Sequence, residues 1–306
     1  METNYIISRQ QHLFFEEHGY LVITNGFTRE EIEKHKIWAK VVRDLPQTHE
    51  PCGYLQYQEI NNKGERVLCR VENFAEEVFG FNSLLRGMKL VGIVSQLANT
   101  HMVLFKDKLN YKSAGAGGFA AHVDRVGYGA FSNLKHLSIA IAIDPAHTGN
   151  GGIEVVPGSH KMDVPIGADN TLEKSWVEAQ QWVPVDLKSG KSDLLIQSAK
   201  HRNNGVQKGD MLIFGTSFAH RSGPNLSTHD RRVIYATYNR AIDGDNHDAY
   251  YLERAKRYPS SHHRIPGVDY RDGSASYAYG TPMLTIENLE SNATAGKNDN
   301  DNGSSN

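Results

Sequence analysis

From about residue 100 onward, the sequence is a succession of short apolar runs separated by Gly, Pro, Asn and Asp. Short apolar runs bounded by such residues predict β-strands, and a succession of several of them predicts an antiparallel barrel or sandwich. The predicted strands span 101–112, 134–144, 152–156, 182–187, 209–215 and 231–240. No strand–helix alternation, GxGxxG pattern or Walker A pattern occurs, so the sequence excludes a Rossmann sheet and a phosphate-binding loop.

The first hundred residues contain more helical than strand-like patterns. Thr28 is a typical N-cap, because two glutamates follow it at the start of an amphipathic run. Helices are predicted at 8–17, 28–42, 72–79 and 82–99, with a short strand at 19–23 and an irregular loop at 46–62. The length of that loop is typical of a lid over a binding site.

The C-terminal part divides into a helical pattern at 246–258 and a polar tail that we expect to be disordered. We therefore predict one domain over 1–285, followed by the tail at 286–306. Its parts are a helical region at about 1–100, a β core at about 101–245 and an extension at 246–285.

Composition limits the partners of this chain. With 306 residues, 39% of them hydrophobic, it can form a sizeable core, and its net charge of −2 gives no basic surface for nucleic acid. Cys52 and Cys69 are too few for a disulfide framework. Neither a secretory signal nor an apolar run of membrane-spanning length is found. We predict a cytoplasmic protein without nucleic-acid or membrane partners, and we allow for a homodimer because the sequence does not determine the oligomeric state.

His122 and Asp124 form a His-x-Asp pair between two predicted strands. Residues two apart on a strand point the same way, so the imidazole and the carboxylate can converge on one point. Joined by a distant histidine, they would form the facial triad that binds Fe(II) and leaves positions open. A hydrogen-bonded loop pair is the alternative interpretation. His160, after Pro-Gly-Ser, is a rival ligand that we interpret as a brace of its turn.

A second element follows the predicted strand 209–215. It contains His220, then a turn marked by Gly and Pro, and Arg231 and Arg232 at the start of the next strand. An arginine at this distance can return alongside a metal and hold a carboxylate with two hydrogen bonds. A metal with open positions beside such an arginine favours a 2-oxo acid. Its keto oxygen and nearer carboxylate would bind the metal, and its far carboxylate would pair with the arginine.

Four segments together resemble the phytanoyl-CoA dioxygenase family of Fe(II)- and 2-oxoglutarate-dependent oxygenases. They are 14–22 (FFEEHGYLV), 122–124 (HVD), 150–161 (NGGIEVVPGSHK) and 220–225 (HRSGPN) with Arg231 after it. The resemblance implies a double-stranded β-helix, a jelly-roll or cupin-like core flanked by helices. It implies O2 as a further co-substrate. The residues that it places are His122, Asp124 and His220 as metal ligands, Arg231 (with Arg232 as the fallback) for 2-oxoglutarate, and Ser222 on the same carboxylate.

A narrower resemblance concerns the substrate. Residues 105–112 and 250–254 look like members that hydroxylate small aminoalkylphosphonates, although Val123 and Arg125 depart from those members. In the predicted strand 101–112, one face carries Lys106, Lys108, Asn110 and Lys112. Lys108 and Asn110 are therefore candidates for an anionic group of 2-oxoglutarate or of the substrate, whereas Lys106 and Lys112 could equally be solvated charges at the rim.

The remaining interpretations stay open from the sequence. Tyr111, Tyr128 and Phe131 could form a cage for an ammonium group, or they could be ordinary core aromatics. The function that the sequence favours is hydroxylation of a small polar molecule such as an aminoalkylphosphonate. A tailoring oxygenase of secondary metabolism with a bulkier substrate is the first alternative, and a non-catalytic β-helix binding module is the second.

Overall fold

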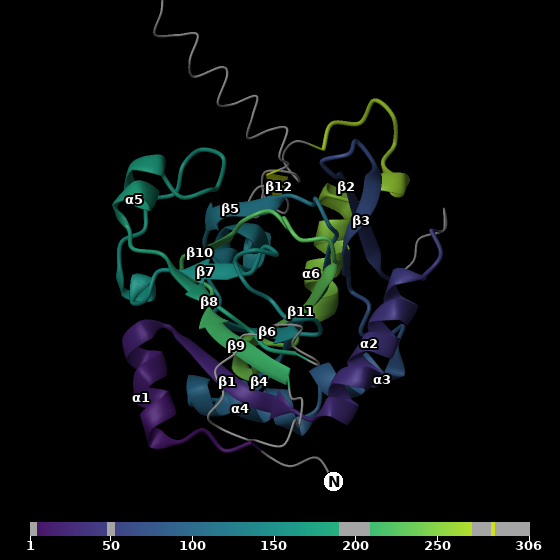
Figure 1. The fold of residues 1–306 in the computed structure, drawn as a ribbon. Coiled ribbons are helices and arrows are strands. Elements are labelled where there is room, and N and C mark those ends of the chain that lie inside the picture. Colours follow the sequence, from purple (N-terminus) through teal and green to yellow (C-terminus); the bar gives the residue numbers. More distant parts are fainter. Residues whose placement is uncertain (1–4, 48–52, 190–208, 271–282, 285–306) are drawn as a thin grey trace, which may run out of the picture.

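The computed structural model describes residues 5–47, 53–189, 209–270 and 283–284. Two antiparallel sheets face each other (Figure 1). The large sheet contains β1 (Tyr20–Phe27), β9 (Gly209–Gly215), β6 (His136–Ala142), β11 (Arg231–Arg240), β4 (Met102–Lys112), β3 (Arg66–Glu72) and β2 (Leu55–Ile60), in that spatial order. The small sheet contains β12 (Met283–Leu284), β5 (Gly118–His122), β10 (His220–Ser222), β7 (Ile153–Val155) and β8 (Val183–Val185).

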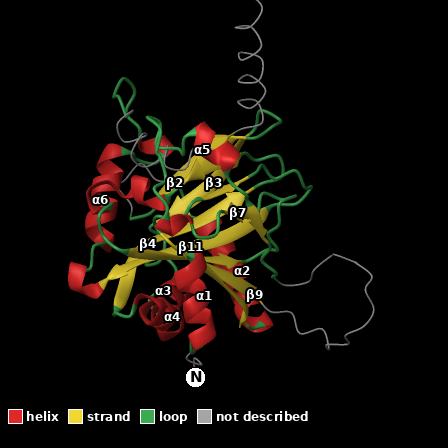
Figure 2. Ribbon diagram, turned by 90° about the vertical axis from the view of Figure 1, so that its left-hand side faces the viewer, coloured by secondary structure: helices red, strands yellow, loops and turns green. Residues whose placement is uncertain are grey.

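The helices lie mainly outside the large sheet. They are α1 (Arg9–His18), α2 (Arg29–Arg43), α3 (Phe79–Leu85), α4 (Met88–Ala98), α5 (Lys174–Ala179) and α6 (His247–Arg257). Figure 2 shows α1, α3 and α4 on the side of the large sheet away from β7. Ser8 and Thr28 are the N-caps of α1 and α2, and each forms a capping box. The N-cap side chain accepts a hydrogen bond from the backbone N–H of the third helical residue, whose own side chain accepts one from the backbone N–H of the N-cap.

Apolar side chains fill two layers. The outer face of the large sheet packs on α2, α3 and α4 through fully buried residues such as Phe81, Ile93 and Ile234. A second cluster, which includes Val155, Phe214 and Val233, lies between the two sheets. Burial of these side chains stabilises the sandwich and leaves the inner face of β3, β4 and β11 for polar groups.

The predicted jelly-roll architecture is confirmed, and all six predicted strands are present. Two predictions in the first hundred residues are wrong. The segment 46–62, predicted as a loop, contains β2, and 72–79, predicted as a helix, begins with the last residue of β3. The N-terminal third therefore combines α1 to α4 with three strands of the large sheet, of which β1 was predicted. Residues 48–52, with Cys52, and the predicted disordered tail lie outside the described residues.

Candidate functional site

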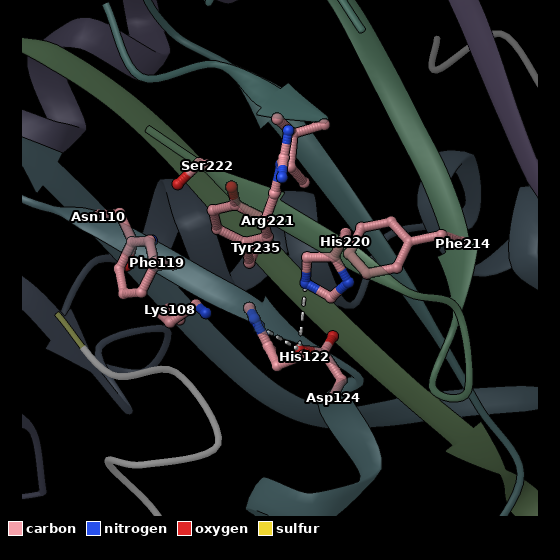
Figure 3. A pocket seen from close by; sticks show the side chains of 11 residues that line it. Lys108, Asn110, Phe119, His122, Asp124, Phe214, His220, Arg221, Ser222 and Tyr235 are labelled. Carbon is pink, nitrogen blue, oxygen red and sulfur yellow. Dashed lines mark ion pairs between the residues drawn. The ribbon is translucent and has the colours of Figure 1, made fainter. Parts of the chain in front are cut away.

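The potential metal ligands come from adjacent ends of the small sheet. His122 ends β5, Asp124 begins the short 3-10 helix η1 (Asp124–Phe131), and His220 begins β10 opposite His122. The Nε2 atoms of His122 and His220 lie 3.8 and 3.7 Å from Asp124 Oδ1 (Figure 3). Within the described ranges, these three side chains form the one group of His, Cys, Asp and Glu arranged to hold a metal ion.

A backbone carbonyl orients each histidine ring. His122 Nδ1 lies 2.6 Å from the carbonyl oxygen of Ala120, and His220 Nδ1 lies 2.9 Å from that of Phe218. A carbonyl only accepts, so Nδ1 donates in both rings and Nε2 keeps the lone pair that a metal ligand requires. Burial, followed by repulsion from His220, lowers the pKa of His122 to about 3, which keeps this ring neutral at pH 7.

Asp124 supplies the negative charge of this group. Burial acts to raise its pKa, but His220 and Lys108 outweigh burial and hold the pKa below its usual range. Ser138 Oγ on β6 donates to Asp124 Oδ2 over 3.4 Å and so connects the carboxylate to the large sheet. Two imidazoles that present Nε2 and one carboxylate at a cavity wall fit Fe(II), since this donor set is that of the facial triad.

A cavity of about 340 Å³ lies against the three side chains. β4 contributes Lys108 and Asn110 to it, and β10 contributes Ser222 (Figure 3). The lining residues that the sequence patterns did not mark as binding residues are Phe119, Ile153, Phe214, Arg221 and Tyr235. Tyr235 also interacts with Arg231, four residues earlier on β11. Both residues project from the same face of that strand, and this period-two spacing could have identified Tyr235 from the sequence.

The two arginines at the start of β11 have different partners. The Arg231 guanidinium is buried and donates to the carbonyl oxygens of Asn150 (3.2 Å) and Gly151 (2.8 Å). Arg232 forms a two-pronged ion pair with Asp144, with N–O distances of 2.7 and 2.9 Å. Arg231 therefore reaches the cavity through its interaction with Tyr235, while Arg232 is engaged by a carboxylate of its own.

Lys112 belongs to the same end of the cavity and is not a rim charge. It is 3% exposed and lies opposite Arg231 in the register of β4 and β11. Its Nζ donates to Ser222 Oγ (2.9 Å), to the carbonyl of Gly223 (2.8 Å) and to that of Gly151 (3.3 Å). Burial, and then the charge of Arg231, lower the pKa of Lys112 well below its usual range.

The aromatic cage of Tyr111, Tyr128 and Phe131 is not formed. The Tyr111 hydroxyl donates to the carbonyl of Ala39, on the outer face of the large sheet. Tyr128 and Phe131 both pack against Phe105 in a separate cluster. These side chains are wall and core aromatics, as the alternative interpretation held.

His160 lies away from the metal-binding group. Its Nε2 donates to the carbonyl of Glu16 over 3.1 Å, and its ring packs directly on Gly19, whose φ is +81°. A Cβ at Gly19 would overlap the ring, so this glycine permits the contact as well as the end of α1. His160 therefore connects its turn to the end of α1 and stands apart from the group of His122, Asp124 and His220.

Comparisons with known proteins agree with this geometry. The family model described as phytanoyl-CoA dioxygenase (PhyH) matches residues 15–233. A 2-aminoethylphosphonate dioxygenase from an uncultured bacterium (HF130_AEPn_1) is 28% identical, covering 90% of this chain and 98% of that protein. A methylphosphonate hydroxylase of Gimesia maris is 26% identical over 78% of this chain and 84% of its own length.

Solved structures show the same fold. The crystal structure of EctD from S. alaskensis with 2-oxoglutarate and 5-hydroxyectoine has a TM-score of 0.62 and 16% identity, covering 79% of this chain and 80% of that one. In the described part of this chain, every helix falls short of a membrane span in length or apolar character. The predictions of an oxygenase with Fe(II) as cofactor and 2-oxoglutarate as co-substrate are confirmed. The chain belongs to the phytanoyl-CoA dioxygenase family.

Proposed function

We propose that this protein hydroxylates a small acidic or zwitterionic molecule, of the aminoalkylphosphonate class, with Fe(II), 2-oxoglutarate and O2. One observation carries the proposal. The group of His122, Asp124 and His220 opens on a small cavity whose other wall carries Lys108 and Asn110.

The chain's own residues have distinct roles in this scheme. His122 and His220 present their Nε2 atoms, and Asp124 presents a carboxylate, so the three would hold Fe(II). When bound, Fe(II) supplies the activation of O2, with 2-oxoglutarate converted to succinate and CO2 while a C–H bond of the substrate is hydroxylated. Arg231 and Ser222 lie at one end of the cavity and would bind the far carboxylate of 2-oxoglutarate.

The lining of the cavity favours a small polar substrate over a bulky one. The same space beside the metal-binding group must also hold 2-oxoglutarate, which limits the room left for a substrate. Lys108 and Asn110 face this space, where a bulky tailoring substrate would call for a wide apolar wall. The similarity to 2-aminoethylphosphonate dioxygenase and methylphosphonate hydroxylase supports the same class. A non-catalytic module is disfavoured because all the ligand residues and Arg231 are present.

Succinate formation tests this function. The full chain, loaded anaerobically with Fe(II), is given 2-oxoglutarate and air with and without 2-aminoethylphosphonate. We expect slow succinate formation alone and a marked stimulation by the phosphonate. Iron-bound protein that forms no succinate under either condition would contradict the oxygenase function and favour the binding module. The cytoplasmic location and the homodimer stay predictions.

A further inference from the structure

The large sheet carries a buried carboxylate that is surrounded by cations. Glu72, the last residue of β3, is fully buried. Its carboxylate lies 2.9 Å from Arg70 Nε and 2.9 Å from Arg254 Nε. Lys106 Nζ follows at 3.8 Å. Arg254 comes from α6 and is fully buried, so this cluster joins β3, β4 and the C-terminal helix.

Lys108 extends this cluster to the cavity. It lies opposite Glu72 in the register of β3 and β4, and directly opposed residues project from the same face of a sheet. Lys108 lines the cavity together with the metal-binding group, and its Nζ lies 4.5 Å from the centre of the Tyr235 ring. Over the described ranges, no carboxylate or hydrogen-bond acceptor contacts this ammonium group.

The balance of charge on this wall calls for an anion. Lys106, Lys108 and the two arginines outnumber the buried carboxylates near them, which are Glu72 and, on the Arg70 side, Glu59, since Asp124 belongs to the metal-binding group. Buried charge without a partner is costly in free energy. Burial accordingly lowers the pKa of Lys106 to about 8, and burial with repulsion from Lys106 lowers that of Lys108 to about 7. A bound anion would offset the excess positive charge.

This anion site is separate from the one at Arg231. Lys108 and Lys112 are four residues apart on β4, or about 13 Å at roughly 3.3 Å per residue. Lys112 is hydrogen-bonded to Ser222, at the end where Arg231 lies, and Arg231 is its cross-strand neighbour. Tyr235 lies between the two places, since it interacts with Arg231 and its ring centre lies 4.5 Å from Lys108 Nζ, and 2-oxoglutarate would occupy the place at Arg231.

We propose that Lys108, with Lys106 beside it and the Arg70–Glu72–Arg254 group supporting both, binds the acidic group of the substrate, and that this group is a phosphonate or a comparable dianion. This inference rests on the proposed function and specifies its substrate. A dianion offsets more of the excess charge than a carboxylate does, and an uncharged head group offsets none. Lys108 is the contact residue, while Arg254 acts through Glu72 as a positioning residue.

The test separates the two anion sites by their saturation curves. Succinate formation by the Fe(II)-loaded full chain is measured against 2-aminoethylphosphonate at saturating 2-oxoglutarate, and against 2-oxoglutarate at saturating phosphonate. In Lys108→Met we expect the half-saturating phosphonate concentration to rise at least tenfold and that of 2-oxoglutarate to change less than threefold. Lys108→Arg should recover part of the loss. Lys40→Met, which removes a largely exposed lysine of α2, is the matched control and should change neither value.

Three results would overturn the inference. The first is a larger shift for 2-oxoglutarate than for the phosphonate, which would assign Lys108 to the co-substrate. The second is stimulation by 2-aminoethanol that equals stimulation by the phosphonate. The third is wild-type succinate formation that neither 2-aminoethylphosphonate nor methylphosphonate stimulates. If Lys108→Met does not fold, the half-saturating concentrations of the phosphonate and of 2-oxoglutarate are compared in Lys108→Arg instead, and the same criteria apply to them. Failure of the proposed function is distinct, because the wild type would then form no succinate at all.

Discussion

The two walls of the cavity are built in different ways. On the small-sheet side, His122 and His220 come from the ends of very short strands and Asp124 from the start of η1, so these groups are two imidazoles and one carboxylate. The large sheet supplies Lys108 and Glu72 from long paired strands, and these groups carry charge. In our proposal, the first wall provides the groups for oxidative chemistry and the second provides the groups that choose the substrate. Reactivity would then depend on local spacing, whereas selectivity would depend on the register of distant segments.

Removal of a candidate metal ligand should cause the largest loss of succinate formation, and it changes only the small-sheet wall of the cavity. Loss of an outer partner of a metal ligand already costs about 10- to 100-fold. We therefore expect His122→Ala or Asp124→Ala to reduce succinate formation by at least about a thousandfold. Iron content per chain should fall with it. His160→Ala is the matched control, because this histidine braces Glu16 and Gly19, and it should retain its iron. Iron loss in His160→Ala with retention in His122→Ala would contradict the ligand assignment.

Neutralising Glu72 should damage the stability of the large-sheet wall. The change leaves three buried cations around an amide, and breaking a buried charge pair costs about 3–5 kcal/mol. Denaturant unfolding of Glu72→Gln should show a loss of this size. Glu33→Gln, which breaks an exposed pair with Lys36, should cost less than about 1 kcal/mol. Equal losses in the two variants would show that the buried cluster has no special role.

The Glu72 carboxylate should make the difference in stability between wild type and Glu72→Gln depend on pH. Burial acts to raise the pKa of Glu72, but Arg254, Lys106 and Arg70 outweigh it and lower the pKa to about 2. A lowered pKa gives stability that is present above the ordinary value and is lost as the pH falls through the folded-state value. The stability difference between wild type and Glu72→Gln should therefore be full above about pH 4.5 and shrink towards pH 2. A difference that grows on acidification would contradict this account.

The two arginines of β11 test where 2-oxoglutarate binds. Charged hydrogen bonds contribute about 1.5–3 kcal/mol, so Arg231→Ala should raise the half-saturating 2-oxoglutarate concentration about 10- to 150-fold. Arg232→Ala removes the same chemical group at the next position and breaks only the pair with Asp144. Its 2-oxoglutarate constant should stay within about threefold of the wild type. A larger rise of the half-saturating 2-oxoglutarate concentration in Arg232→Ala than in Arg231→Ala would assign Arg232 as the residue that binds 2-oxoglutarate.

Ser138 connects the two walls, and its removal should have the smallest of these effects. It lies on the large sheet and donates to Asp124, which belongs to the metal-binding group. Ser138→Ala should weaken Fe(II) affinity about tenfold, at the lower end of the range for outer partners of ligands. Thr237→Ser, which keeps the neighbouring hydroxyl, is the control. Unchanged affinity in Ser138→Ala would mean that the small sheet orients Asp124 by itself.

The His-x-Asp pair of the metal-binding group is a local sequence pattern, whereas the set of three candidate ligands was predicted from the resemblance to the phytanoyl-CoA dioxygenase family. His122 and Asp124 are two residues apart, and His220 follows a long apolar strand whose bounds the pattern predicts. The strands that carry the histidines were not predicted, since β5 and β10 have five and three residues and are too short to show a period. β2 was predicted as a loop because Pro, Gly and Tyr dominate the segment that leads into it.

The charged wall could be predicted only in part. Alternation along β4 places Lys106 and Lys108 on one face, as expected. Glu72 was assigned to a helix, and its contact with Arg254 spans 182 residues. Such a contact depends on the register of β3 with β4 and on the docking of α6, and no local pattern encodes either. Sequence spacing therefore predicted the face on which Lys108 lies, but not the Glu72–Arg254 contact that supports this face.

Coupled product analysis tests the central claim most directly. The Fe(II)-loaded chain is given 2-oxoglutarate, O2 and 2-aminoethylphosphonate, and succinate and the phosphonate product are quantified together by mass spectrometry. The account predicts a product heavier than the substrate by one oxygen atom, formed in equal amount to succinate, and ¹⁸O2 should supply that atom. Succinate formed without any oxygenated phosphonate would contradict the claim that the charged wall presents such a substrate to the metal-binding group.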